Sequence, residues 1–133
     1  MTKKKILIVD DSKGWLDYHV SALTQIYGEK FILETAISGR AGYDKVYNNL
    51  SEPYSLIISD LQMEYDFEPK YAGEWFIERV KELNQYEKTP IIIISATYNI
   101  RTIADYLHVN CLPKAIAARD LTSYELAMNE LIN

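Results

Sequence analysis

The chain has 133 residues, of which 48% are hydrophobic and 25% charged. This size and balance are typical of one soluble globular domain. The net charge of −5 argues against a nucleic-acid-binding surface, which needs clustered positive charge. Cys111 is the only cysteine, so an intrachain disulfide is excluded.

The amino terminus begins with three lysines at positions 3–5, followed by a short apolar run at residues 6–9. Four apolar residues are too few for a signal peptide, and Asp10 and Asp11 end the run. No stretch approaches the roughly 20 apolar residues of a membrane span. We therefore expect a cytoplasmic protein with no direct contact to a membrane, and a single domain over residues 1–133.

Short apolar runs alternate with longer segments of helical periodicity along the chain. The apolar runs lie at residues 6–9, 31–37, 56–58, 91–94 and 109–112. Unbroken runs of this kind are typical of parallel strands that are covered on both faces. The helical stripes between and after them are Leu16, Val20, Leu23 and Tyr27; Tyr43, Val46, Tyr47 and Leu50; Phe76, Val80 and Leu83; Ile100, Ile103, Ala104 and Leu107; and Tyr124, Met128 and Leu131. Five βα units predict an α/β fold with right-handed crossovers.

Polar residues follow four of the five predicted strands at once or after one residue. Asp10 and Asp11 follow the first strand, Asp60 the third, Ser95 the fourth and Lys114 the fifth. In an open α/β sheet, ligands bind beyond the carboxyl ends of the strands. Each residue alone has an ordinary explanation: Asp10 and Asp11 could cap a helix, and Asp60 could stabilise a turn. Their joint occurrence at one sheet edge favours a functional site.

Three carboxylates would converge if the first and third strands are neighbours, since neighbouring strands lie about 4.8 Å apart. Two like charges about 4 Å apart repel by roughly 4 kcal/mol at an effective dielectric constant of 20. Such a cluster requires a cation or raised pKa values, and Mg²⁺ suits a small set of oxygen ligands. A metal ion, the Lys114 ammonium and the Ser95 hydroxyl around one carboxylate indicate a phosphoryl-transfer site.

The segments 6–12, 56–63, 91–96 and 112–114 resemble the motifs of receiver domains of bacterial response regulators. The resemblance extends over essentially the whole chain. It implies a flavodoxin-like (βα)5 three-layer sandwich with the parallel sheet order 2-1-3-4-5. It also implies a single-domain chemotaxis-regulator-like protein that signals by conformational change to a protein partner.

The same resemblance assigns roles to the strand-end residues. Asp60 would accept a phosphoryl group from a histidine kinase or a phosphotransfer protein. Mg²⁺ would be held by Asp11, Asp60 and the backbone carbonyl of Gln62, with Asp10 acting through water. Lys114 would pair with the phosphoryl oxygens, and Ser95 would turn its hydroxyl toward them.

The chain departs from the family pattern around this site. Glu64 stands where the family has proline, and a glycine follows only at Gly73, so residues 64–72 form either a partner surface or a tolerated insertion. Lys114 precedes Ala115, where the family has a cis proline; the bond is either a strained cis bond or a trans bond with Lys114 placed differently.

Two further departures affect signalling. Cys111 occupies the position of the aromatic switch residue, for which Tyr98 or Tyr106 are the candidate replacements. The stretch from Ser95 to Lys114 is shorter than usual, which trims the fourth helix. Trp15 follows the acid pair closely enough to lie near a metal, whereas Trp75, His19 and His108 are expected to be structural or solvated.

The sequence is compatible with three functions. The first is a phosphorylatable module that turns over no external substrate and catalyses only its own Mg²⁺-dependent phosphorylation and dephosphorylation. The second is a pseudo-receiver that binds a protein partner without phosphorylation. The third, a flavodoxin-like cofactor protein or a phosphatase, is disfavoured because residues 10–14 place carboxylates where a phosphate-binding loop needs backbone amides.

Overall fold

The computed structural model describes residues 3–63 and 72–132. Its five strands are β1 (Lys4–Val9), β2 (Phe31–Ala36), β3 (Leu56–Ser59), β4 (Ile91–Ser95) and β5 (Asn110–Pro113). The helices are α1 (Lys13–Tyr27), α2 (Gly39–Tyr47), α3 (Ala72–Lys81), the 3₁₀ helix η1 (Asn84–Tyr86), α4 (Ile100–Leu107), α5 (Lys114–Arg119) and α6 (Leu121–Ile132). Of the loop expected at residues 64–72, residues 64–71 lie outside the described part of the chain.

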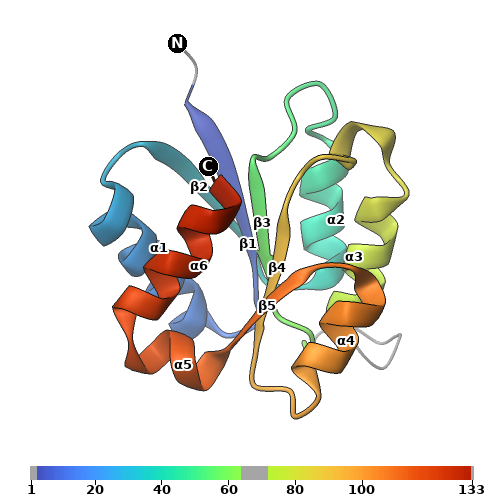
Figure 1. The fold of residues 1–133 in the computed structure, drawn as a ribbon. Helices are drawn as coiled ribbons and strands as arrows, with labels where there is room; N and C mark the ends of the chain where they lie inside the picture. Colours follow the sequence, from blue (N-terminus) through green and yellow to red (C-terminus); the bar gives the residue numbers. More distant parts are fainter. Residues whose placement is uncertain (1–2, 64–71, 133) are drawn as a thin grey trace.

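All strands are parallel and pair in the order β2-β1-β3-β4-β5. Figure 1 shows α1, α5 and α6 on one face of the sheet and α2, α3 and α4 on the other. The predicted α/β class, three layers and sheet order are therefore confirmed. The start of β1 and the end of α6 lie toward one end of the sandwich, and the carboxyl ends of the strands point to the other (Figure 1).

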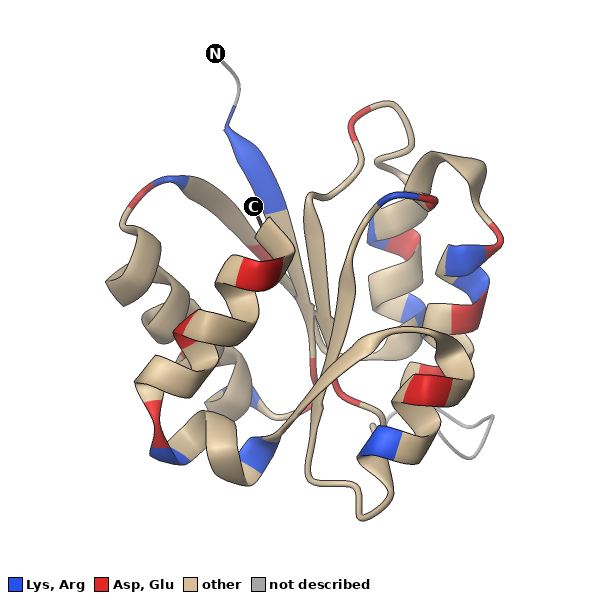
Figure 2. Ribbon diagram, viewed as in Figure 1, with Lys and Arg blue, Asp and Glu red and all other residues tan. Residues whose placement is uncertain are grey.

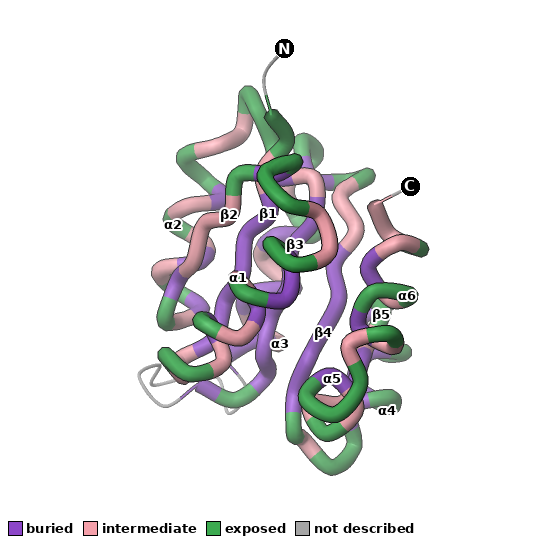
Figure 3. Tube along the Cα trace, turned by 90° about the vertical axis from the view of Figure 1, so that its left-hand side faces the viewer, coloured by how far each residue is buried: buried purple, intermediate pink, exposed green. Residues whose placement is uncertain are grey.

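The central strands are buried because both of their faces pack against helices. Along β1, Ile6 and Ile8 pack toward α1 and α6, while Leu7 and Val9 pack toward α2 and α3. This alternation follows from the two-residue repeat of a strand. The tube in Figure 3 is buried along β1, β3 and β4. The edge strand β2 is only partly covered, which corrects the prediction that every strand is covered on both faces.

The predicted helical stripes are correct where one full helix covers the sheet. Ile100, Ile103, Ala104 and Leu107 of α4 are all buried, as the spacing predicts. In α2 the prediction is wrong for Tyr47, whose side chain is 56% exposed although its neighbour Val46 is completely buried. Adjacent helical residues point about 100° apart, so Tyr47 faces solvent when Val46 faces the sheet.

The last βα unit contains two helices instead of the single predicted one. The backbone of Asp120 is extended between α5 and α6. Its carboxylate accepts hydrogen bonds from the Thr122 N–H and the Ser123 hydroxyl, at 3.0 and 2.7 Å, so it caps the second helix. This break leaves α5 as a six-residue helix that begins at Lys114, directly after β5.

Candidate functional site: an acidic cluster with one lysine

Strand pairing brings Asp10 and Asp60 together. Val9 pairs with Ser59 at the ends of β1 and β3, and the Asp60 N–H continues this ladder by donating to the Val9 carbonyl at 2.9 Å. The Asp10 N–H in turn donates to the carbonyl of Ala36 at the end of β2, at 3.1 Å. Backbone hydrogen bonds to rigid strands therefore fix both residues at the sheet edge.

The carboxylates of Asp10, Asp11 and Asp60 converge at this edge. One carboxylate oxygen from each lies within 4.8 Å of the others. Asp10 and Asp60 are buried, and Asp11 is half-buried. Acidic segments meet at the carboxyl end of the sheet in Figure 2, close to the basic start of α5.

Lys114 lies against two of these carboxylates. Its Nζ is 3.0 Å from Asp10 Oδ2 and 3.0 Å from Asp60 Oδ2, and its side chain is 12% exposed. Register again provides the placement, because Ser95 pairs with Pro113 and Lys114 follows at once. The ammonium therefore reaches the acidic cluster even though Ala115, and not proline, comes next.

Hydrogen bonds orient both buried carboxylates. Asp10 Oδ1 accepts the Ser12 N–H at 2.9 Å, and Asp60 Oδ1 accepts the Leu61 N–H at 2.7 Å. One oxygen of each carboxylate is thus fixed by the backbone, and the other contacts Lys114.

The carboxylates and the Lys114 ammonium affect each other's pKa. Burial raises the pKa of Asp10, and the neighbouring Asp60 charge adds to this, against the opposing effects of the Ser12 N–H and Lys114. Burial alone would lower the pKa of Lys114, but Asp60 and Asp10 outweigh it and raise that pKa above its ordinary value. Lys114 is therefore a cation at neutral pH, and it neutralises only part of the cluster.

The donor set fits Mg²⁺. With all three carboxylates ionised, the single ammonium would leave two negative charges in excess in a largely buried space. A hard divalent cation that takes oxygen ligands and keeps several waters would balance them. Asp10, Asp11 and Asp60 offer such oxygens, whereas Gln62 has an exposed side chain and the role of its backbone carbonyl stays a prediction.

Ser95 is buried at the end of β4, as its predicted position requires. Its hydroxyl lies 2.8 Å from the Thr97 hydroxyl and accepts the Thr97 N–H at 3.2 Å. Thr97 was not singled out in the sequence, although a second hydroxyl two residues after a strand-end serine is a readable signal. The two hydroxyls thus contact each other at the same edge of the sheet as the acidic cluster.

Gly73 has a role at the site that its place after residues 64–72 does not reveal. It lies at the start of α3 and donates its N–H to the Leu61 carbonyl at 2.8 Å. A Cβ at this position would lie 1.9 Å from the Asp60 carbonyl oxygen and 2.7 Å from Leu61 Cα. Only glycine lets α3 approach the backbone of Asp60 this closely.

Both aromatic candidates for a switch have exposed side chains. Tyr98 and Tyr106 are exposed, with relative accessibilities of 101% and 71%, and Cys111 is half-buried in β5. Burial raises the pKa of the Cys111 thiol, so it is a packing residue in the neutral form. Trp75 packs edge-on against Tyr43, with 5.9 Å between ring centroids, which agrees with the structural role expected of it.

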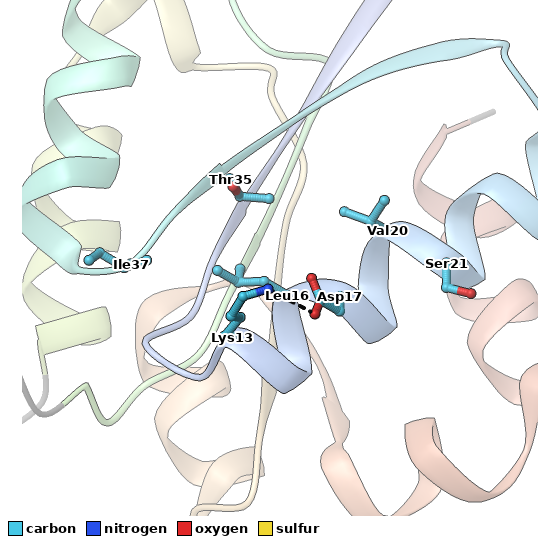
Figure 4. A pocket seen from close by; sticks show the side chains of 7 residues that line it. All are labelled: Lys13, Leu16, Asp17, Val20, Ser21, Thr35 and Ile37. Atoms are coloured by element: carbon cyan, nitrogen blue, oxygen red, sulfur yellow. Dashed lines mark hydrogen bonds and ion pairs between the residues drawn. The ribbon is translucent and has the colours of Figure 1, made fainter.

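A separate hollow of about 540 Å³ lies between α1 and β2. Figure 4 shows its lining: Lys13, Leu16, Asp17, Val20, Ser21, Thr35 and Ile37. Lys13 and Asp17 form an exposed ion pair at 3.3 Å on its rim. None of the acidic-cluster residues lines it, so the hollow is distinct from the strand-end site.

Comparison with solved structures identifies the fold. The chain is similar to the chemotaxis protein CheY4 of Vibrio cholerae, with 21% identity, a TM-score of 0.76 and coverage of 98% of this chain and 99% of that one. It is similar to the signal receiver domain of a DNA-binding response regulator from Colwellia psychrerythraea 34H, with 16% identity, a TM-score of 0.78 and 98% of each chain covered. A BeF3-activated DrrB receiver domain matches with 16% identity, a TM-score of 0.72 and the same coverage. No family model and no curated protein matches the sequence.

Within the described residues, no helix is long and apolar enough to cross a membrane.

Proposed function

We propose that this chain, which has the fold of CheY-like response regulator receiver domains, is a phosphorylatable receiver module whose acceptor is Asp60. The observation that supports the proposal most is the contact of one ammonium, Lys114 Nζ, with both Asp10 and Asp60 at 3.0 Å inside a cluster of three carboxylates. Structural carboxylates at strand ends do not require this arrangement, whereas phosphoryl transfer requires positive charge held beside the acceptor.

In the proposed reaction, a carboxylate oxygen of Asp60 attacks the phosphorus of a phosphohistidine on a histidine kinase or phosphotransfer protein. A phosphorus–oxygen bond forms, the phosphorus–nitrogen bond breaks, and the imidazole leaves with the bonding electron pair. Lys114 neutralises charge on the phosphoryl oxygens. Asp10, Asp11, Asp60 and the backbone carbonyl of Gln62 would hold Mg²⁺, which supplies further charge neutralisation when bound.

The hydroxyl of Ser95 provides the first movement of the proposed signal. In the proposed switch it donates to a phosphoryl oxygen in place of its 2.8 Å contact with the Thr97 hydroxyl. Phosphorylation thus exchanges one local hydrogen bond for another and shifts the loop after β4 toward the site. The output is a change of surface recognised by a protein partner, with no external substrate turned over.

The test uses a small phosphodonor, acetyl phosphate, with Mg²⁺, and beryllofluoride as a phosphoryl mimic. Intact-mass spectrometry of the wild type should show one added phosphoryl group, and Asp60→Asn should show none. Asp44→Asn, which changes an exposed aspartate of α2, is the matched control and should react like the wild type. Absence of an adduct in the wild type, or its persistence in Asp60→Asn, would contradict the proposal.

The same experiment separates the proposal from a pseudo-receiver. A constitutive interaction domain would bind its partner equally well with and without Mg²⁺ and phosphodonor. Beryllofluoride should instead change backbone amide shifts around Ser95, Thr97 and Lys114 in the proposed module. Unchanged shifts in these three residues at saturating beryllofluoride would favour the phosphorylation-independent alternative.

A further inference from the structure

The indole of Trp15 lies against the ammonium of Lys114. Trp15 belongs to the first turn of α1, and Lys114 Nζ is 4.9 Å from the centroid of its ring. Tryptophan is the strongest aromatic partner for a cation within about 6 Å. Lys114 therefore contacts two carboxylates and one aromatic face at the same time.

Nothing within α5 holds the Lys114 side chain. Lys114 is the first residue of this six-residue helix, and Pro113 provides no side-chain hydrogen bond as its N-cap. A helix of this length is not stable by itself. The lysine side chain also has a flexible four-carbon stem, which loses much conformational freedom when the ammonium is fixed. The position of the ammonium must therefore be set by contacts from other elements.

Besides the two carboxylates, these contacts come from α1. The backbone N–H of Trp15 donates to the Ser12 hydroxyl at 3.2 Å, and this hydrogen bond caps the start of the helix. The indole packs edge-on against Tyr18, with 5.2 Å between centroids. The Tyr18 hydroxyl donates in turn to the carbonyl of Ala117 in α5. One turn of α1 thus contacts both the ammonium and the backbone of the helix that begins at Lys114.

We propose that Trp15 is a positioning residue, which holds the Lys114 ammonium between Asp10 and Asp60 while Tyr18 holds α5 in place. The kinetic consequence of this inference rests on the proposed function, whereas the contact itself does not. An ammonium that is already placed beside the acceptor needs no reorganisation when charge develops on the transferring phosphoryl group.

Two substitutions distinguish the effect of the aromatic ring of Trp15 from the effect of its size. Trp15→Leu keeps an apolar side chain without a ring, and Trp15→Phe keeps a ring. Trp75→Leu is the matched control, because Trp75 lies on α3 against Tyr43 and its ring contacts Arg40. The ε-methylene signals of Lys114 are measured by NMR in lysine-labelled protein and are assigned by their loss in Lys114→Arg.

In the wild type, the ring current of Trp15 should move the Lys114 ε-methylene protons upfield of the other lysines. Trp15→Leu should abolish this shift and slow phosphorylation by acetyl phosphate roughly five- to tenfold, the factor expected for loss of one partly desolvated cation–π contact. Trp15→Phe should retain part of the shift and react within about twofold of the wild type. Trp75→Leu should leave both measurements unchanged.

Absence of the upfield shift in the wild type would overturn the inference, even if Trp15→Leu fails to fold. Equal slowing by Trp15→Leu and Trp75→Leu would also overturn it, because the effect would then reflect general loosening of the fold. If the wild type forms no phosphoryl adduct at all, the proposed function fails. The ring-current comparison still decides in that case whether Trp15 holds Lys114.

Discussion

His19 is an imidazole enclosed within the core between α1 and α6. Its Nδ1 lies 2.7 Å from the Tyr124 hydroxyl, and only 1% of the residue is exposed. Burial, together with the charge of Lys114, lowers the pKa of His19 to about 3. The folded protein therefore keeps this ring neutral, while the unfolded chain protonates it near pH 6.5.

The first prediction is a loss of stability in acid that originates at His19. Between pH 6.5 and about 3 the unfolded state binds one more proton than the folded state, so stability falls as the pH falls. The full shift corresponds to as much as about 5 kcal/mol. Urea unfolding of wild type and His19→Asn should show a flatter pH dependence in the variant. Parallel curves for the two proteins would refute this assignment.

Gly73 provides the second prediction, which concerns steric fit beneath the acceptor. Gly73→Ala places a Cβ 1.9 Å from the Asp60 carbonyl oxygen, so the start of α3 must move away. Such overpacking costs about 1–3 kcal/mol or more and exceeds the roughly 1 kcal/mol that alanine gains in helix propensity. Unfolding by urea should therefore show a net loss of stability.

The control for this substitution is Gly14→Ala at the start of α1. Apart from its chain neighbours and the backbone of its own helix, the atom nearest to a Cβ there is the Ser12 hydroxyl oxygen at 3.7 Å, an ordinary contact distance. Because Gly14 is also exposed, alanine should leave stability unchanged or raise it slightly. Equal effects at both glycines would show that the approach of α3 to Asp60 is not restrictive.

Single residues were predictable from the sequence where their position on the sheet edge followed from periodicity. Asp10, Asp60 and Lys114 each come at once or one residue after an apolar run, and parallel strands end at a common edge. The close approach of Gly73 and the burial of His19 could not be inferred in this way. Both depend on which helix packs beside which strand, and one sequence does not specify side-chain neighbours across elements.

Helices and strands were predicted best where one element covers one buried surface. The stripe of α4 is entirely correct, since all four of its residues are buried. The prediction failed after β5, where Asp120 ends α5 and caps α6. An aspartate followed two and three residues later by a threonine and a serine indicates a helix cap, but apolar residues on both sides obscured it.

The third prediction concerns the contact between α1 and α5. Tyr18→Phe removes the hydroxyl that donates to the Ala117 carbonyl, and Ala117 is fully buried. Loss of this hydrogen bond should reduce the free energy of unfolding by about 1 kcal/mol. Amides of α5 should also exchange with solvent faster, because this hydrogen bond joins the short helix to α1.

Tyr98→Phe is the control for that substitution, because the Tyr98 side chain is fully exposed. It should change neither the unfolding free energy nor the exchange of α5 amides. If Tyr18→Phe behaves in the same way, α5 is held by its packing alone. The role assigned to the α1 contact would then be wrong.

At the scale of the molecule, register determines the site. Val9 opposite Ser59 places Asp10 beside Asp60, and Ser95 opposite Pro113 places Lys114 after β5. A slip of one residue in either pair would turn the side chains to the opposite face of the sheet. The hydrophobic cores on both faces prevent such a slip, so the stability of the whole sandwich maintains the acidic cluster against its own repulsion.

The last prediction concerns how the whole fold responds to Mg²⁺. If the acidic cluster binds Mg²⁺ only in the folded state, Mg²⁺ at 100 times its dissociation constant should stabilise the protein by about 2.7 kcal/mol. Lys114→Met removes the ammonium that partly neutralises Asp10 and Asp60. In the presence of EDTA this variant should lose about 2–4 kcal/mol, because buried carboxylates are left without their cation.

Mg²⁺ should then restore more stability to Lys114→Met than it adds to the wild type, since the ammonium and the metal neutralise the same carboxylates. We expect the difference to be about 1 kcal/mol after screening by solvent. Lys13→Met, which removes an exposed lysine paired with Asp17, should respond to Mg²⁺ as the wild type does. Urea unfolding of the three proteins in EDTA and in Mg²⁺ measures these increments. An identical Mg²⁺ increment in all three would mean that Lys114 and the metal act on different carboxylates, and no increment would exclude the acidic cluster as a Mg²⁺ site.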